Sequence, residues 1–207
     1  MAIRSFLAFE LPPDIRNEVK RFSTEVKKTG LNASWVKPDN IHLTIIFMGD
    51  VDEKDIPAII SAIDPIVSQY GIFDISLGGM GLFPNIKRPR VIWLGLNGDI
   101  QGIASLKTDL GKPLESFGIK QEKRPFKPHL TLGRFRKPVI EKAFLKKIID
   151  DYSNIPGPDG KLDELVLFKS ELKPGGAVYS RIHSWPLKRN NINGQLNFPK
   201  AGRSLII

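Results

Sequence analysis

The chain has 207 residues, 41% of them hydrophobic, and carries a formal net charge of +9 at pH 7. This length fits one large domain or two small lobes, and the apolar content argues against a disordered chain. The lack of cysteine excludes disulfides, a thiolate nucleophile and cysteine metal ligands, and no apolar stretch approaches the ~20 residues that span a membrane.

Strand and helix patterns alternate through the first half of the chain. Residues 4–11 alternate and are rich in Phe and Leu, which predicts a strand. The residues before this strand lack the apolar region and cleavage site of a secretory signal, so we expect a cytoplasmic protein. Pro13 and Asp14 then open a predicted helix that ends near residue 28. A strand that carries His42, a helix over about residues 53–69 and a strand over residues 72–77 follow.

The second half repeats this order of elements. The pattern predicts a strand over 90–96, a helix over 100–117, a strand that carries His129, a helix over 139–152 and a strand over 162–172. A glycine-rich turn then leads to a final strand over residues 178–186. After residue 187 the periodicity ends.

The repeated order predicts one domain built from two similar units. We place the domain at residues 1–187, its units at about 3–80 and 90–172, and a polar C-terminal tail at 188–207. The fold class that we expect is α+β and bilobal. Two pseudo-symmetric antiparallel sheets, each backed by helices, would enclose the active-site cleft between them.

The tripeptide His-Leu-Thr occurs once in each predicted unit, at His42 to Thr44 and at His129 to Thr131. Residues i and i+2 of a strand point to the same face, so each strand projects an imidazole and a hydroxyl side by side. A single histidine on a strand usually has a structural role. Recurrence at the same point of two units instead favours a functional pair that faces across the cleft. His183 has no such counterpart, and we interpret it as structural.

Two imidazoles and two hydroxyls are suited to acid–base chemistry on a phosphate. The unperturbed pKa of histidine is about 6.5, so one ring can accept a proton from water while the other donates one to a leaving oxygen. The Thr44 and Thr131 hydroxyls can donate hydrogen bonds to phosphate oxygens. Arg134 is a further candidate phosphate ligand. Strict alternation would point it away from His129, but Gly133 could allow a bulge that re-aims it.

Several other motifs have a structural explanation beside a functional one. A metal site at the histidines is disfavoured, because acidic side chains are scarce around both tripeptides. The glycines at 78, 79 and 81 precede no helix, so we interpret them as a turn or bulge rather than a dinucleotide-binding loop. Phe9, Trp35 and Phe126 could stack on nucleobases or pack in the core.

Positive charge concentrates around the second tripeptide. Between residues 120 and 137, seven basic side chains accompany one acid, Glu122. The basic residues are Lys120, Lys123, Arg124, Lys127, Arg134, Arg136 and Lys137. Such a run is either a solvated surface or a region that attracts phosphate.

The two tripeptides and their surroundings resemble the two-histidine phosphoesterases, in particular the RNA 2′,3′-cyclic phosphodiesterases, also called 2′-5′ RNA ligases or LigT-like proteins. The matching segments are 35–49, WVKPDNIHLTIIFMG, and 126–134, FKPHLTLGR. Residues 6–9 and 170–176 are also similar to the family, and the resemblance covers roughly residues 4–187.

The resemblance implies a bilobal fold and a metal-independent, cofactor-free reaction. A terminal 2′,3′-cyclic phosphate of RNA would be opened to a 2′-phosphate, with His42 as proton donor and His129 as proton acceptor. Thr44 and Thr131 would bind the phosphate. The reverse sense of this chemistry would join a 5′-hydroxyl through a 2′-5′ bond without ATP. RNA is the partner implied, with no membrane and no protein partner.

Two alternatives remain open from the sequence. The enzyme could act on a small cyclic nucleotide instead of RNA. The chain could also be an RNA-binding module whose histidines are not catalytic.

Overall fold

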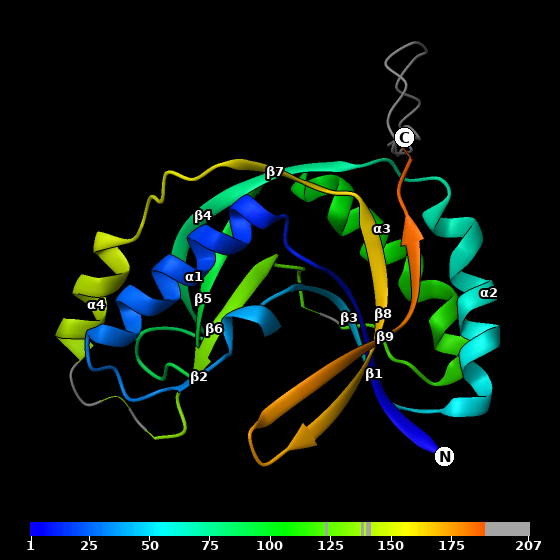
Figure 1. Ribbon diagram of the computed structural model, residues 1–207, viewed down its shortest axis with the longest axis horizontal. Coiled ribbons are helices and arrows are strands. Elements are labelled where there is room, and N and C mark those ends of the chain that lie inside the picture. Colours follow the sequence, from blue (N-terminus) through cyan, green and yellow to red (C-terminus); the bar gives the residue numbers. More distant parts are fainter. Residues whose placement is uncertain (123, 138, 140–141, 189–207) are drawn as a thin grey trace, which may run out of the picture.

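The computed structural model describes residues 1–122, 124–137, 139 and 142–188. Two antiparallel sheets form the body of the molecule, and helices lie beside each sheet (Figure 1). The predicted bilobal α+β fold is therefore confirmed. Of the predicted tail, positions 189–207 lie outside the described residues.

Sheet A has the strand order β3-β1-β8-β9. Its strands are β1 (Ala2–Phe9), β3 (Leu43–Asp52), β8 (Glu164–Lys173) and β9 (Gly176–Pro186). Sheet B has the order β2-β6-β5-β4-β7. Its strands are β2 (Ser34–Trp35), β4 (Phe73–Phe83), β5 (Val91–Gly98), β6 (His129–Arg134) and β7 (Asp159–Leu162).

Each predicted repeat contributes its last long strand to the sheet of the other repeat. β4 comes from the first unit but pairs with β5, and β8 comes from the second unit but pairs with β1. The order β3-β1-β8-β9 in sheet A consequently matches β6-β5-β4-β7 in sheet B. The approximate two-fold relation is thus present in the topology, and neither sheet is built from one repeat alone.

The helices follow the predicted pattern closely. They are α1 (Pro13–Lys28), α2 (Ile56–Val67), α3 (Ile100–Leu114) and α4 (Lys142–Asp151). In α1 the buried side chains Ile15, Val19, Phe22 and Val26 recur at helical spacing on one face, and Pro13 stands at the first turn, where its missing N–H costs nothing. Positions 140 and 141 of the predicted fourth helix lie outside the described residues.

Some strand predictions were wrong in extent. β4 runs on through the glycines at 78, 79 and 81, which form a bulged strand because the pairing with β5 shifts between Leu77 and Met80. The predicted strand over 162–172 corresponds to β8, except that Leu162 instead ends β7, which belongs to the other sheet. Both errors concern pairing between distant segments, which a local pattern does not encode.

The core lies mainly between the helices and the sheets. A second, small cluster of buried side chains packs apart from this core and consists of Phe6, Ala8, Val166 and Phe168, with Tyr179 against it. Side chains of β1 are therefore buried on both faces of sheet A. None of the described helices is long and apolar enough to cross a membrane.

Candidate active site

His42 lies one residue before β3, after the short 3₁₀ turn η1 (Pro38–Asn40). We had predicted that it lies within the strand. Its Nδ1 is 2.8 Å from the backbone carbonyl oxygen of Asn40. The imidazole stacks on Phe6 with ring centroids 4.8 Å apart, so the His42 ring packs against the small cluster of sheet A.

His129 is the first residue of β6 and has the same anchor. Its Nδ1 is 2.8 Å from the carbonyl oxygen of Lys127, again two residues earlier. Phe83 meets the ring edge-on at 4.8 Å. The Lys127 ammonium lies 4.6 Å from the ring centroid of Trp93, which itself contacts the imidazole. The side chain of Lys127 is thereby held against the aromatic residues that surround His129.

These anchors determine which nitrogen of each ring is free to exchange protons. A carbonyl oxygen only accepts hydrogen bonds, so Nδ1 must carry the hydrogen in both histidines. Nε2 is then the nitrogen that can take or give a proton. The two motifs are therefore alike both in their residue types and in how the imidazole ring is oriented.

Both motif strands also contain a β-bulge one residue after the threonine. The pairing of β3 with β1 skips Ile45, and the pairing of β6 with β5 skips Leu132. Thr44 and Thr131 are both half-buried. Because a bulge interrupts the alternation of side chains, residues beyond it change face.

The bulge in β6 affects Arg134. Strict alternation would place this side chain with the buried Leu130 and Leu132. Arg134 is instead exposed. We predicted a bulge at Gly133, and it lies one residue earlier.

Thr44 and His129 line one cleft although they belong to different sheets. The cleft has a volume of about 1320 Å³. β3 and β6, which do not pair with each other, have Cα atoms within 8 Å of one another. The two motifs are therefore neighbours across the junction of the sheets.

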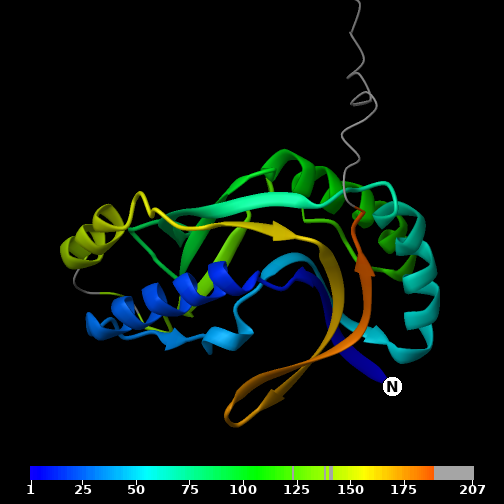
Figure 2. The ribbon, with the colours of Figure 1, turned by 45° about the horizontal axis from the view of Figure 1, so that its top comes forward.

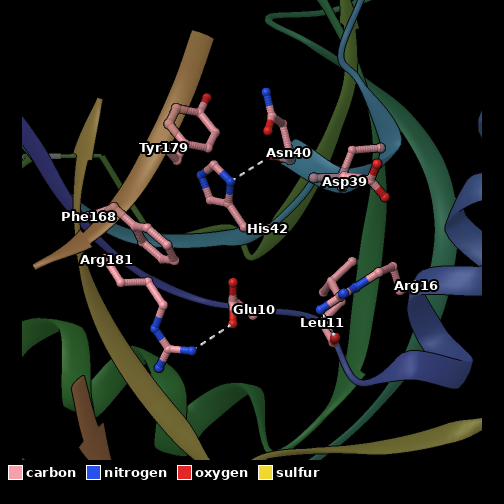
Figure 3. Close-up of a pocket in the computed structure, with 10 residues that line it drawn as sticks. Glu10, Leu11, Arg16, Asp39, Asn40, His42, Phe168, Tyr179 and Arg181 are labelled. Carbon is pink, nitrogen blue, oxygen red and sulfur yellow. Dashed lines mark hydrogen bonds and ion pairs between the residues drawn. The ribbon is translucent and has the colours of Figure 1, made fainter. Parts of the chain in front are cut away.

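His42 lines a second, smaller recess of about 270 Å³ (Figure 3). Phe168 and Tyr179 flank the imidazole in this recess, and Glu10 forms an ion pair with Arg181 at its far side. The recess is thus aromatic beside the histidine and charged farther away.

Burial lowers the pKa of both histidines below its ordinary value. For His42, loss of hydration opposes the charged form, and the hydrogen bond to Asn40 offsets this only in part. For His129, burial again lowers the pKa most, the bond to Lys127 opposes it, and the positive charge of Arg134 lowers it further.

Basic side chains surround the cleft. Lys120, Arg124 and Lys127 of the predicted basic run line it. Lys123 lies outside the described residues. Arg88, Arg90 and Lys107 also line the cleft. They come from other segments of the chain, so the basic run over 120–137 did not predict them.

The three candidate stacking residues have different surroundings. Phe9 is fully buried in the core, and Trp35 is partly buried against it. Phe126 lines the cleft, with the Lys107 ammonium 4.6 Å from its ring centroid. Among the described residues, no three His, Cys, Asp or Glu side chains are grouped so that they could hold a metal ion.

Comparison with known proteins gives a consistent family assignment. A model described as LigT-like phosphoesterase matches residues 9–93 and again 94–179. An RNA 2′,3′-cyclic phosphodiesterase of Methanothermobacter thermautotrophicus is 32% identical over 180 residues, which cover 87% of this chain and 96% of that protein. A protein of the same name from Methanocaldococcus jannaschii is 32% identical over 186 residues, which cover 88% of this chain and 100% of the other.

Solved structures give the same fold. A protein of Thermus thermophilus superposes with a TM-score of 0.74 at 27% identity, over 90% of this chain and 99% of that one. The structure of Escherichia coli LigT complexed with 3′-AMP superposes with a TM-score of 0.69 at 24% identity, over 91% of this chain and 100% of the other.

Proposed function

The chain belongs to the LigT-like phosphoesterase family, and from this premise we propose that it opens the 2′,3′-cyclic phosphate at the end of an RNA chain to a 2′-phosphate. The observation that carries the proposal is the matched anchoring of the two imidazoles. Each Nδ1 donates to a carbonyl two residues earlier, so each Nε2 is available for proton transfer. The curated relatives that bear this activity in their names are similar over nearly their whole length.

In the proposed reaction the two histidines act in opposite protonation states. Neutral His129 takes a proton from water at Nε2, and the water oxygen forms a bond to phosphorus. The bond between phosphorus and the 3′ oxygen breaks, and protonated His42 gives its proton to that oxygen. The product carries a 2′-phosphate and a free 3′-hydroxyl. Joining a 5′-hydroxyl to the cyclic phosphate would use the same groups, with the hydroxyl in place of water.

Thr44, Thr131 and Arg134 are the proposed phosphate ligands. Both hydroxyls stand two residues after a histidine on the motif strands, and the Arg134 guanidinium is close enough to His129 to lower its pKa. Hydrogen-bond donors and a positive charge stabilise the negative charge that builds up on the phosphate oxygens in the transition state. The chemistry proposed here requires no metal ion.

The cleft favours RNA over a small cyclic nucleotide as substrate. Its basic lining suits several phosphates, and Phe126 supplies an aromatic surface within it. A single mononucleotide would leave most of these charges without a partner.

The proposal is tested by incubating the protein with an RNA oligonucleotide that ends in a 2′,3′-cyclic phosphate, in the presence of a chelator. We expect a 2′-phosphate end and a higher kcat/KM than for the matching cyclic mononucleotide. Activity that needs a divalent cation would contradict the metal-free mechanism. RNA binding without any turnover would favour a binding module.

A further inference from the structure

We propose that the hydroxyl of Tyr179, on β9, is a further phosphate-binding group of the active site. This inference rests on the proposed function of the two histidines and adds a residue that lies outside both repeated motifs. The β8–β9 hairpin that carries it projects from the body of sheet A (Figures 1 and 2). A segment far along the chain would thus complete the site.

The ring of Tyr179 is fixed beside His42. It meets the imidazole edge-on with ring centroids 5.3 Å apart, and it meets Phe6 in the same way at 5.0 Å. The Tyr179 side chain flanks the imidazole in the recess (Figure 3). Aromatic contacts on two sides leave the ring little freedom, so the position of the hydroxyl is defined.

The Tyr179 hydroxyl differs from those of the other two tyrosines. Tyr70 donates to Asp109 at 2.6 Å, and Tyr152 donates to Glu25 at 3.3 Å. Within the part of the chain that the structure describes, the Tyr179 hydroxyl makes no such bond to a side chain. A half-buried tyrosine hydroxyl usually has a partner, and an anionic ligand would supply one here.

The charges near Tyr179 also suit an anion. Burial raises the pKa of the phenol, while the positive charges of Arg134 and Arg4 act in the opposite direction. The phenol remains protonated and can donate a hydrogen bond. The positive charge of Arg134 also lowers the pKa of His129, so Arg134 acts electrostatically on both Tyr179 and His129.

Asn40 holds Tyr179 and His42 in one assembly. Its side-chain amide donates to the carbonyl oxygen of Ala177 at 2.8 Å, two residues before Tyr179. Its own backbone carbonyl accepts from His42 Nδ1. The strand that carries the phenol and the turn that orients the imidazole are therefore joined through one residue.

We infer that the phenol donates to a non-bridging oxygen of the cyclic phosphate and retains this bond as negative charge grows there. Tyr179→Phe removes only the hydroxyl and keeps the ring against His42. We expect kcat/KM on a cyclic-phosphate RNA to fall about 10- to 100-fold, the range for a hydrogen bond to a charged group. Tyr152→Phe is the control, because it removes a tyrosine hydroxyl near α1 and α4, away from both histidines.

Binding of inorganic phosphate, followed by NMR, separates the possible roles of Tyr179. The inference requires that Tyr179→Phe weaken phosphate binding by about the same factor, with an unchanged His42 pKa and melting temperature. Unchanged phosphate affinity, with or without a loss of turnover, would overturn it and leave the ring as a packing element. If the wild-type protein binds phosphate through Tyr179 but turns over no cyclic RNA end, the proposed function fails, and with it the role of Tyr179 in turnover, although Tyr179 still binds phosphate.

Discussion

At the scale of single residues, each of the two candidate catalytic imidazoles is oriented by a hydrogen bond to the backbone. The Nδ1 of His42 and of His129 donates to a carbonyl two residues earlier, at 2.8 Å in both cases. Such a bond selects one tautomer and stops the ring from turning over. It depends on backbone geometry, so no neighbouring side chain needs to supply a carboxylate.

Removing either imidazole should abolish most of the activity. General acid–base help is worth about 10²–10⁴-fold per group, so His42→Ala and His129→Ala should each lower kcat by at least that factor on a cyclic-phosphate RNA. The double variant should lose less than the product of the two factors, since the histidines act in one step. His183→Ala is the control, because that ring packs on Trp185 in β9 and should leave kcat unchanged.

The pH dependence of activity follows from the lowered pKa values. Burial moves both histidines below the ordinary 6.5, and the active form needs one ring protonated and the other neutral. The bell-shaped profile of kcat/KM should therefore have its maximum below pH 6.5, with one limb for each histidine. A maximum above pH 7 would contradict this assignment.

The same shifts affect stability in a defined direction. The unfolded chain takes up protons at these histidines near pH 6.5, whereas the native protein does so only at lower pH. The free energy of unfolding should therefore decrease as pH falls from 6.5 toward the native pKa values, and this slope should diminish in His42→Asn.

At the scale of the elements, a bulge follows the threonine of each motif, and a turn precedes the first motif. The η1 turn places the Asn40 carbonyl under His42, and the bulges at Ile45 and Leu132 change which face the following residues occupy. Elements that depart from regular geometry thus aim the groups of the site, while regular helices and strands support them.

Asn40 should act as a positioning residue for His42. Asn40→Ala removes the bond to Ala177, which is worth about 0.5–1.5 kcal/mol of stability, yet leaves the backbone carbonyl in place. We expect kcat to fall about tenfold or more, because the turn that orients the imidazole loses its tie to β9. Asn97→Ala is the control, because it removes a similar bond to the Leu77 carbonyl in sheet B. It should lower the melting temperature by about as much as Asn40→Ala does, without loss of kcat.

The bulge in β4 should tolerate no side chain at Gly79. A Cβ there would overlap the backbone carbonyl of Ser153, which cannot swing aside as a flexible side chain could. Gly79→Ala should cost about 1–3 kcal/mol, or roughly 2–12 °C in melting temperature for a chain of this size. At Gly175 an added Cβ meets only the Lys37 Nζ at 4.0 Å, so Gly175→Ala should melt close to the wild type.

At the scale of the whole molecule, exchange of strands between the repeats creates the cleft. β8 joins the sheet of the first motif and β4 joins the sheet of the second, so the two repeats cannot separate without breaking the pairs β1–β8 and β4–β5. Phe168 on β8 then lies near His42, and Phe83 on β4 lies near His129. Each candidate catalytic histidine is therefore surrounded partly by residues of the other repeat.

The charge of the cleft should determine how RNA binding responds to salt. Each lost phosphate contact lowers the slope of log affinity against log salt by about 0.7 for a single strand. Replacing Arg88, Lys120 and Arg124 with Gln should therefore reduce the slope by up to about 2. The control replaces Lys20, Lys27 and Lys28 on α1, which removes the same charge outside the cleft lining. Equal effects of both triple variants would mean that net charge alone matters.

The sequence by itself determined the secondary structure in outline, the two repeats and the paired histidines. These follow from local periodicity and from one repeated tripeptide. Periodicity indicates which face of a helix or strand is buried, and this does not depend on which other element covers that face. Only the tertiary structure decided which strands pair across the repeats, where Arg134 is aimed, and that Tyr179 lies beside His42. The Asn40 side chain and the Ala177 carbonyl are 137 positions apart, and their contact depends on how two sheets pack. Packing between distant segments depends on the fit of whole surfaces, which no short stretch of sequence contains.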